Sequence, residues 1–145
     1  IERMGHPEGV PTASQVTDLR TIMDARQYMD RIYLDPKITE YILDLVFATR
    51  PECREQLSPR QKEADLRGLD SLIQYGASPR ASLALTLVAK ARAFLQGRAY
   101  VVPQDVKDIA PDILRHRIAP TYEAEAENLN SDALIKRLLD ELRTP

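Results

Sequence analysis

Tryptophan is absent from this 145-residue sequence, only 6% of its residues are aromatic, and cysteine occurs once, at Cys53. Aliphatic side chains must therefore supply most of the hydrophobic core. A single cysteine excludes an internal disulfide, and we expect an ordinary thiol in a reducing, cytoplasmic compartment. The length and the 43% hydrophobic content suit one soluble globular domain.

Charge of one sign and long apolar runs are also lacking. The formal net charge is only −2, whereas a general nucleic-acid binder needs a strong basic excess. No apolar stretch approaches the roughly 18 residues of a membrane-spanning helix. We therefore expect no nucleic-acid partner and no membrane span. A helical nucleic-acid binder is a third, minor alternative, and it would use Arg60, Lys62, Arg67, Lys90, Arg92 and Arg98.

The phosphate-binding loop of an ATPase is missing as well. That loop requires Gly-x-x-x-x-Gly-Lys-Ser/Thr, and none of the glycines, at positions 5, 9, 68, 76 and 97, precedes a lysine. No strand ends in paired carboxylates that could hold Mg²⁺. His6 and His116 are isolated, and Glu123, Glu125 and Glu127 alternate in a polar stretch, so we predict no metal site. By itself the chain cannot hydrolyse ATP, and it can only contribute residues to a site built elsewhere.

Helical periodicity is what the sequence does contain. Apolar spacing, with Asp35-Pro36 as a cap-and-proline start, predicts helices over 18–30, 36–49, 79–96 and 131–143. A shorter helix begins at Pro103 and is interrupted by Pro111. The apolar stripe of helix 79–96 consists of Leu83, Leu87, Ala91 and Leu95, and Gly97 stands where a C-terminal cap belongs.

The remaining segments complete the predicted organisation. Residues 32–34 and 100–102 are short β-favouring runs that could pair as a two-stranded ribbon. The connection 51–75 is long and rich in charge, with leucines that could tuck against the core. We predict an all-α fold, a compact helical bundle over residues 18–145, preceded by a leader or connection at 1–17.

The stretch Gly-Ala-Ser-Pro-Arg-Ala-Ser at 76–82 predicts a stop and a new helix start. Gly76 can adopt a positive φ, Ser78 is a good N-cap, and Pro79 then occupies the first helical position. Arg80 falls in the first turn, with no acidic residue nearby. An arginine beside free backbone N–H groups suits an anion such as phosphate. The alternative is an arginine whose stem covers apolar surface while its head stays in water.

This stretch, continued by Leu83-Ala84-Leu85, resembles the sensor-2 segment of the MoxR family of AAA+ ATPases. Residues 97–106 and 110–117 are similar to stretches that follow it in that family, in the same order and spacing. Weaker similarity extends to 45–50 and 122–127. Val102 is a departure, because the family more often has a hydroxyl residue at this N-cap, which should weaken the cap by about 1 kcal/mol.

The resemblance covers roughly residues 18–145 and implies the C-terminal helical lid behind an α/β nucleotide-binding core. It assigns Arg80 as the sensor-2 arginine, which approaches the γ-phosphate of ATP, with Ser78 and Pro79 supporting the helix start. It also implies that the absent core binds ATP and Mg²⁺, that the chain alone binds neither, and that the parent is an ATPase. Such parents resemble homo-hexameric, chaperone-like rings that act with von Willebrand A domain proteins.

Arg50, Arg115 and Arg117 are candidates for a subunit interface. Each follows a helix or turn, where a cation suits the C-terminal partial charge, so a solvated helix end is the alternative. A rival hypothesis for the whole chain is a stand-alone helical interaction module that uses no nucleotide. It rests on the missing phosphate-binding loop and on apolar stripes such as the one over 134–142.

Overall fold

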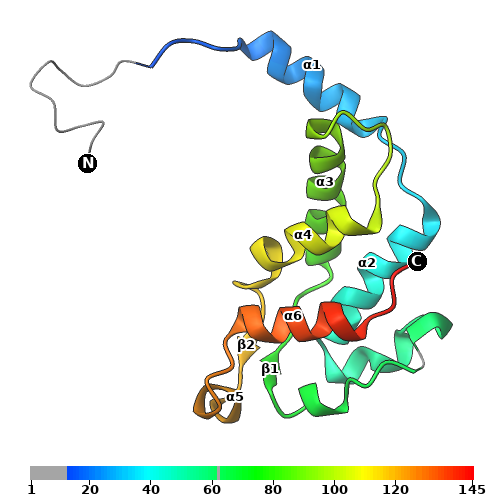
Figure 1. The fold of residues 1–145 in the computed structure, drawn as a ribbon, viewed down its shortest axis with the longest axis vertical. Helices are drawn as coiled ribbons and strands as arrows, with labels where there is room; N and C mark the ends of the chain where they lie inside the picture. The colour runs from blue at the N-terminus through cyan, green and yellow to red at the C-terminus, as the bar shows by residue number, and fades with distance from the viewer. Residues whose placement is uncertain (1–12, 62) are drawn as a thin grey trace, which may run out of the picture.

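A computed structural model of the chain describes residues 13–61 and 63–145. Its helices are α1 (Leu19–Asp30), α2 (Pro36–Ala48), α3 (Arg80–Leu95), α4 (Pro103–Leu114), α5 (Tyr122–Ala126) and α6 (Ser131–Glu141). Short 3-10 helices η1 (Pro51–Gln56), η2 (Pro59–Gln61) and η3 (Arg67–Leu69) precede strand β1 (Ile73–Tyr75), and strand β2 (Ala119–Pro120) follows α4. The predicted all-α bundle is confirmed (Figure 1).

Some sequence positions fall outside this description. Residues 1–12 of the predicted leader are among them, and residues 13–18 form neither helix nor strand. His6, Lys62 and the glycines at 5 and 9 also lie outside the described residues. Among the residues that the structure does describe, no helix has the length and apolarity needed to cross a membrane.

The core lies between α2, α3, α4 and α6. Tyr41 and Leu45 of α2, Leu85 of α3, Leu114 of α4 and Leu138 of α6 are almost fully buried within it. The predicted cap at α2 is confirmed, because the Asp35 carboxylate accepts a hydrogen bond from the Lys37 amide at 2.8 Å. The predicted apolar stripe of the last helix is also confirmed as core. Its buried members are Leu134, Ile135, Leu138 and Leu142.

The predicted stripe on α3 is wrong in register. Leu83, Leu87 and Leu95 remain 65%, 59% and 81% exposed, and the buried residues are Ala81, Leu85, Ala89 and Ala93. Both sets repeat every four residues, so periodicity alone fits either one. Small side chains let the α3 backbone come close to its neighbours, and α4 is the element with which it makes most contact. Close helix approach therefore selected the alanine register over the more hydrophobic one.

The predicted ribbon is also misplaced. Residues 32–34 and 100–102 share only an isolated parallel bridge between Tyr33 and Tyr100, with the Tyr33 amide donating to the Ala99 carbonyl at 2.9 Å. Each run is followed at once by a proline-started helix, which leaves no length for a ladder. The two-stranded antiparallel sheet instead joins β1 to β2, with Ile73 opposite Pro120.

Pro111 does not interrupt α4, contrary to the prediction. The helix continues through it to Leu114, and the Arg115 amide donates to the Pro111 carbonyl at 3.0 Å. A proline in a helix costs one backbone hydrogen bond. Burial of Ile113 and Leu114 on the core side offsets that cost.

The long connection 51–75 is packed rather than free. Leu66, Leu69 and Leu72 are buried against the bundle, as the sequence suggested. The buried Asp44 carboxylate of α2 accepts hydrogen bonds from the Ser58 amide at 2.8 Å and from its hydroxyl at 2.7 Å. Gln61 adds a bond to Asp44 at 3.3 Å. Gln61 also exchanges two hydrogen bonds of 2.9 Å with the backbone of Arg143, near the end of the chain.

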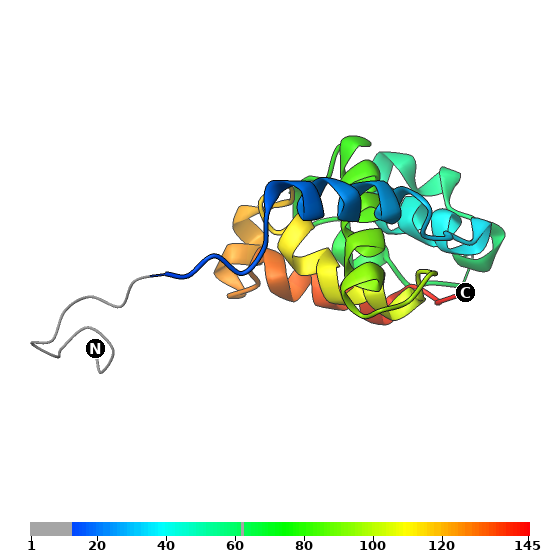
Figure 2. The same cartoon turned by 90° about the horizontal axis from the view of Figure 1, so that it is seen from above.

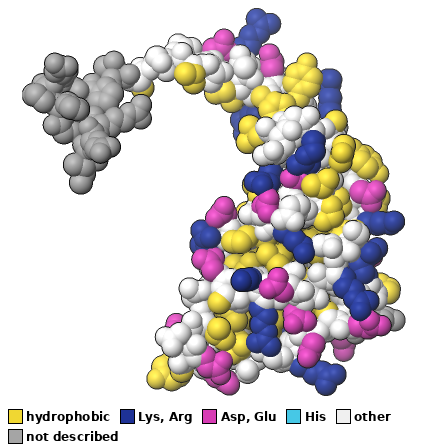
Figure 3. Space-filling view, viewed as in Figure 1, with side chains coloured by type: hydrophobic (Ala, Val, Ile, Leu, Met, Phe, Trp, Pro, Cys, Tyr) yellow, Lys and Arg dark blue, Asp and Glu magenta, His cyan; other side chains and the backbone are white. Residues whose placement is uncertain are grey.

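Helix α1 lies at one end of the molecule, beside the C-terminal half of α3 (Figures 1 and 2). The two meet where the Lys90 ammonium donates to the Asp30 carbonyl at 3.2 Å. No residue of α1 is buried, and its apolar residues Leu19, Ile22 and Met23 are exposed. Figure 3 shows hydrophobic side chains along α1 and charges of both signs interspersed over the rest of that face.

Candidate functional site

Arg80 is the first residue of α3, and its side chain is exposed. The first turn of α3 contains no acidic residue, as the sequence predicted. Within residues 13–61 and 63–145, the Arg80 guanidinium makes no hydrogen bond and no ion pair. The group is therefore available to an anion from outside the bundle.

The start of α3 differs from the predicted cap. Pro79 already has helical dihedrals, φ −54° and ψ −24°, and no side chain caps the helix. The Ser78 hydroxyl therefore does not form the predicted N-cap hydrogen bond. The first turn is closed by backbone instead, because the Ala81 amide donates to the Ser78 carbonyl at 2.8 Å. The Ser82 hydroxyl adds a bond to the Pro79 carbonyl at 2.7 Å.

Gly76 is needed for space and not for a positive φ, which corrects the prediction. Among the described glycines only Gly97 has a positive φ, of 70°. A Cβ on Gly76 would lie 2.2 Å from the Thr49 carbonyl oxygen and 2.5 Å from Cγ of Arg50. The turn before Arg80 therefore lies directly on the C-terminal end of α2. Gly97 does cap α3 as predicted, with the Arg98 amide donating to the Ala93 carbonyl at 2.9 Å.

Thr49 is a residue that the sequence prediction missed. It is fully buried, and its hydroxyl oxygen accepts a hydrogen bond from the Ala77 amide at 2.9 Å. The same hydroxyl donates a hydrogen bond to the Val46 carbonyl at 2.7 Å. The only sequence signal was its place in the weakly similar stretch 45–50. That stretch and 76–82 are brought together in space at this point.

The other candidate arginines all have partners inside the domain. Arg50 pairs with Glu52 at 3.0 Å. Arg115 pairs with Asp112 at 3.1 Å and with Asp132 at 3.0 Å, and so ties the end of α4 to the start of α6.

Arg117 donates to the Ile113 carbonyl and lies 2.6 Å from Nε2 of His116. It therefore satisfies a carbonyl at the end of α4. Of the sensor and interface candidates Arg80, Arg50, Arg115 and Arg117, only Arg80 lacks a side-chain partner among the described residues.

Asp105 is a second residue that the prediction missed. Its carboxylate is 2% exposed, accepts two hydrogen bonds from Arg98 at 2.8 and 2.6 Å, and takes a third from the Val102 amide at 2.9 Å. In this third bond the N3 carboxylate accepts from the N-cap amide; it does not satisfy the first-turn amides that a hydroxyl at position 102 would cap, and no side chain caps them. Burial alone would raise the pKa of Asp105. The hydrogen bonds from Arg98 and Val102, together with the charges of Arg98 and Arg92, instead hold that pKa below 3.8.

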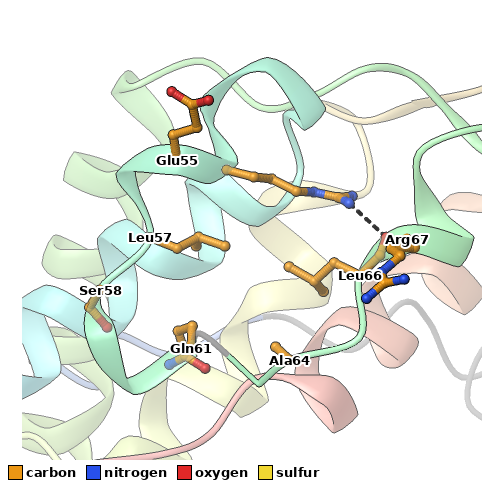
Figure 4. A pocket seen from close by; sticks show the side chains of 8 residues that line it. Glu55, Leu57, Ser58, Gln61, Ala64, Leu66 and Arg67 are labelled. Carbon is orange, nitrogen blue, oxygen red and sulfur yellow. Dashed lines mark hydrogen bonds between the residues drawn. The ribbon is translucent and has the colours of Figure 1, made fainter.

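A pocket of about 280 Å³ lies under η1 and η2, lined by Leu57, Gln61 and Leu66 among others (Figure 4). The Arg54 guanidinium reaches across it to the Leu66 carbonyl at 2.7 Å and pairs with Asp70. Burial lowers the pKa of Arg54, and the Asp70 charge opposes that shift. Arg54 thus has partners inside the domain, whereas the charged residues Glu55 and Arg67, which also line the pocket, are exposed.

No described residues form a cluster of histidine, cysteine or carboxylate groups that could hold a metal ion. Cys53 is a free, half-buried thiol. At the α3 start, the guanidinium of Arg80 is exposed and has no partner among the described residues.

The chain is similar to several known proteins. Residues 69–138 match the AAA lid domain family. Chaperone MoxR1 of Mycobacterium tuberculosis is 32% identical over all 145 residues, which span 36% of that protein. Protein MoxR of Paracoccus denitrificans is 35% identical over 112 residues, which are 74% of this chain and 30% of that protein.

A crystal structure of a Cytophaga hutchinsonii protein inferred to be an ATPase superposes with a TM-score of 0.76 at 37% identity, covering 87% of this chain and 36% of that one. The chain thus spans about a third of the length of these relatives. Its fold, its match to the lid family and its MoxR relatives together show that the chain belongs to the helical lid domains of the MoxR family of AAA+ ATPases.

Proposed function

We propose that this chain is the lid of a MoxR-type AAA+ ATPase and that Arg80 senses the γ-phosphate of ATP bound by a core domain of the same protein. The observation that supports this most directly is the exposed guanidinium at the first residue of α3, which has no partner among the described residues. The three interface candidates, Arg50, Arg115 and Arg117, instead have partners within the domain.

The physics of the contact suits a switch. A guanidinium stays charged at any working pH and can spread its donors over several phosphate oxygens. One charge-assisted contact contributes on the order of 1.5–3 kcal/mol. Loss of the γ-phosphate removes that contact, so the lid and core then prefer a different relative orientation. Hydrolysis is thereby coupled to motion of the lid.

The rest of the assembly follows from the family. The core supplies the phosphate-binding loop and holds ATP and Mg²⁺, since the chain has no such loop and no metal cluster among its described residues. The parent forms a homo-hexameric, chaperone-like ring in the cytoplasm and acts on partners with a von Willebrand A domain.

The test is Arg80→Ala in the full-length parent protein. We expect ATP turnover to fall by about tenfold or more, in line with one charge-assisted contact, while the fold is retained. Arg60→Ala is the matched control, because Arg60 is exposed on η2 and pairs with no described residue. Equal turnover in the two variants would remove Arg80 from the site.

A stand-alone interaction module is the second candidate function. The exposed leucines of α3 and the uncovered apolar side of α1 favour it, since both faces could bind a protein partner. The reading frame upstream of residue 1 distinguishes the two candidates. A phosphate-binding loop encoded there decides for the ATPase, and a nearby start codon with no such loop decides for the module.

A further inference from the structure

The turn that precedes Arg80 is attached to the end of α2 by a single side-chain hydrogen bond. The Thr49 hydroxyl oxygen accepts from the Ala77 amide at 2.9 Å, and both residues are fully buried. The hydroxyl proton is used in the bond to the Val46 carbonyl at 2.7 Å. A hydroxyl that donates in one fixed direction has its lone pairs fixed as well. The acceptor is therefore held in place for the Ala77 amide.

Packing around this bond leaves the turn little freedom. The missing Cβ of Gly76 allows its backbone to lie against the Thr49 carbonyl, where a Cβ would come within 2.2 Å of the oxygen. Only two residues separate Ala77 from Arg80. The ring of Pro79 fixes its φ, observed at −54°, and the bond from the Ala81 amide to the Ser78 carbonyl closes the turn.

We propose that Thr49 is a positioning residue for Arg80. It touches no phosphate itself, and it acts by holding the turn at 76–79 so that α3 starts at a fixed place on the end of α2. This inference rests on the proposed function of Arg80 as the phosphate sensor. Since the end of α2 and the start of α3 are joined at this point, they would move as one body when the lid rotates.

The test compares Thr49→Val, which keeps the side-chain shape but removes the acceptor, with Thr49→Ser, which keeps the hydroxyl. Both are made in the full-length parent, and kcat and KM for ATP are measured. We expect Thr49→Val to lower kcat about tenfold, as loss of one buried hydrogen bond predicts. The effects on kcat and on KM should stand in the same proportion as in Arg80→Ala. Thr49→Ser should restore most of the activity.

Thr121→Val is the matched control for a purely structural effect. The Thr121 hydroxyl also accepts from a backbone amide, that of Ala124 at 3.2 Å, and donates to a carbonyl, that of Ser71 at 2.7 Å. Because Thr121 is only half-buried, its loss should lower thermal stability by a smaller amount than Thr49→Val, and it should leave kcat unchanged. Should Thr49→Val fail to fold, Thr49→Cys replaces it, because a thiol is a weaker acceptor than a hydroxyl. The expected fall in kcat is then smaller than the fall expected for Thr49→Val.

The double variant Thr49→Val with Arg80→Ala separates the two proposals. If Thr49 acts through Arg80, kcat of the double variant equals that of Arg80→Ala alone. If the two losses multiply, or if Thr49→Val lowers kcat no more than Thr121→Val, the positioning role is overturned while the sensor role of Arg80 stands. If Arg80→Ala itself leaves turnover unchanged, both proposals fall.

Discussion

Asp44→Asn should destabilise the domain by an amount that the structure allows one to estimate. The Asp44 carboxylate is buried, and within the described chain it forms no ion pair. One of its oxygens accepts from the Ser58 amide at 2.8 Å and the other from the Ser58 hydroxyl at 2.7 Å and from Gln61 at 3.3 Å. An asparagine keeps one acceptor oxygen and turns an NH₂ group toward the remaining donors.

The expected loss follows from counting those donors. A buried donor left without an acceptor costs about 1–3 kcal/mol. Gln61 retains the Arg143 carbonyl at 2.9 Å, so the cost falls on Ser58. Removal of the buried negative charge of Asp44 offsets part of this cost. We therefore expect a fall of about 2 kcal/mol in the free energy of unfolding and of about 6 °C in Tm.

Urea denaturation of the 145-residue chain, followed by far-UV circular dichroism, measures this change. Asp140→Asn is the control, since Asp140 is exposed on α6 and the substitution changes the charge equally. We expect the control to stay within about 0.5 kcal/mol of the original chain. If Asp44→Asn falls within the same limit, the Asp44 contacts do not anchor the segment 51–75.

Two further predictions concern Asp105 and the register of α3. The pKa of Asp105 is lowered in the folded state, so its contribution to stability is present above 3.8 and is lost as pH falls through the lower folded pKa. Stability should therefore decrease as pH falls below 3.8, and Asp105→Asn should flatten that decrease; equal pH slopes for the two proteins in urea melts would contradict it. On α3, Leu85→Ala should lower the free energy of unfolding by about 3 kcal/mol and Leu87→Ala by less than about 0.5 kcal/mol. A larger loss at Leu87 in thermal denaturation would contradict the buried alanine register.

Local signals in the sequence were sufficient to place α1, α2, α3, α6 and the start of α4, but not the short helix α5. Asp35-Pro36 marked the start of α2, Pro103 marked the start of α4, and Gly97 marked the end of α3. Each of these acts through its own backbone dihedrals or through a bond within one turn. The position of Arg80 in the first turn of α3, with no acid beside it, depended only on such local chemistry.

Contacts between distant segments were not accessible in this way. The choice between Leu83 and Leu85 as core depended on how closely α3 approaches its neighbours. The sheet partners of β1 came from residues more than forty positions away. The role of Gly76 likewise depended on a carbonyl of Thr49, on another helix.

The sequence by itself thus determined the starts of α2 and α4, the end of α3, the absence of a phosphate-binding loop and the presence of an arginine at a helix start. Each of these depends on residues within a few positions of one another. Only the tertiary structure decided that Arg80 is left without a partner while Arg50 and Arg115 are engaged. It also decided that Thr49 holds the turn before Arg80. These outcomes depend on which segments lie side by side, and burial and close packing fix that arrangement through contacts that no local pattern specifies.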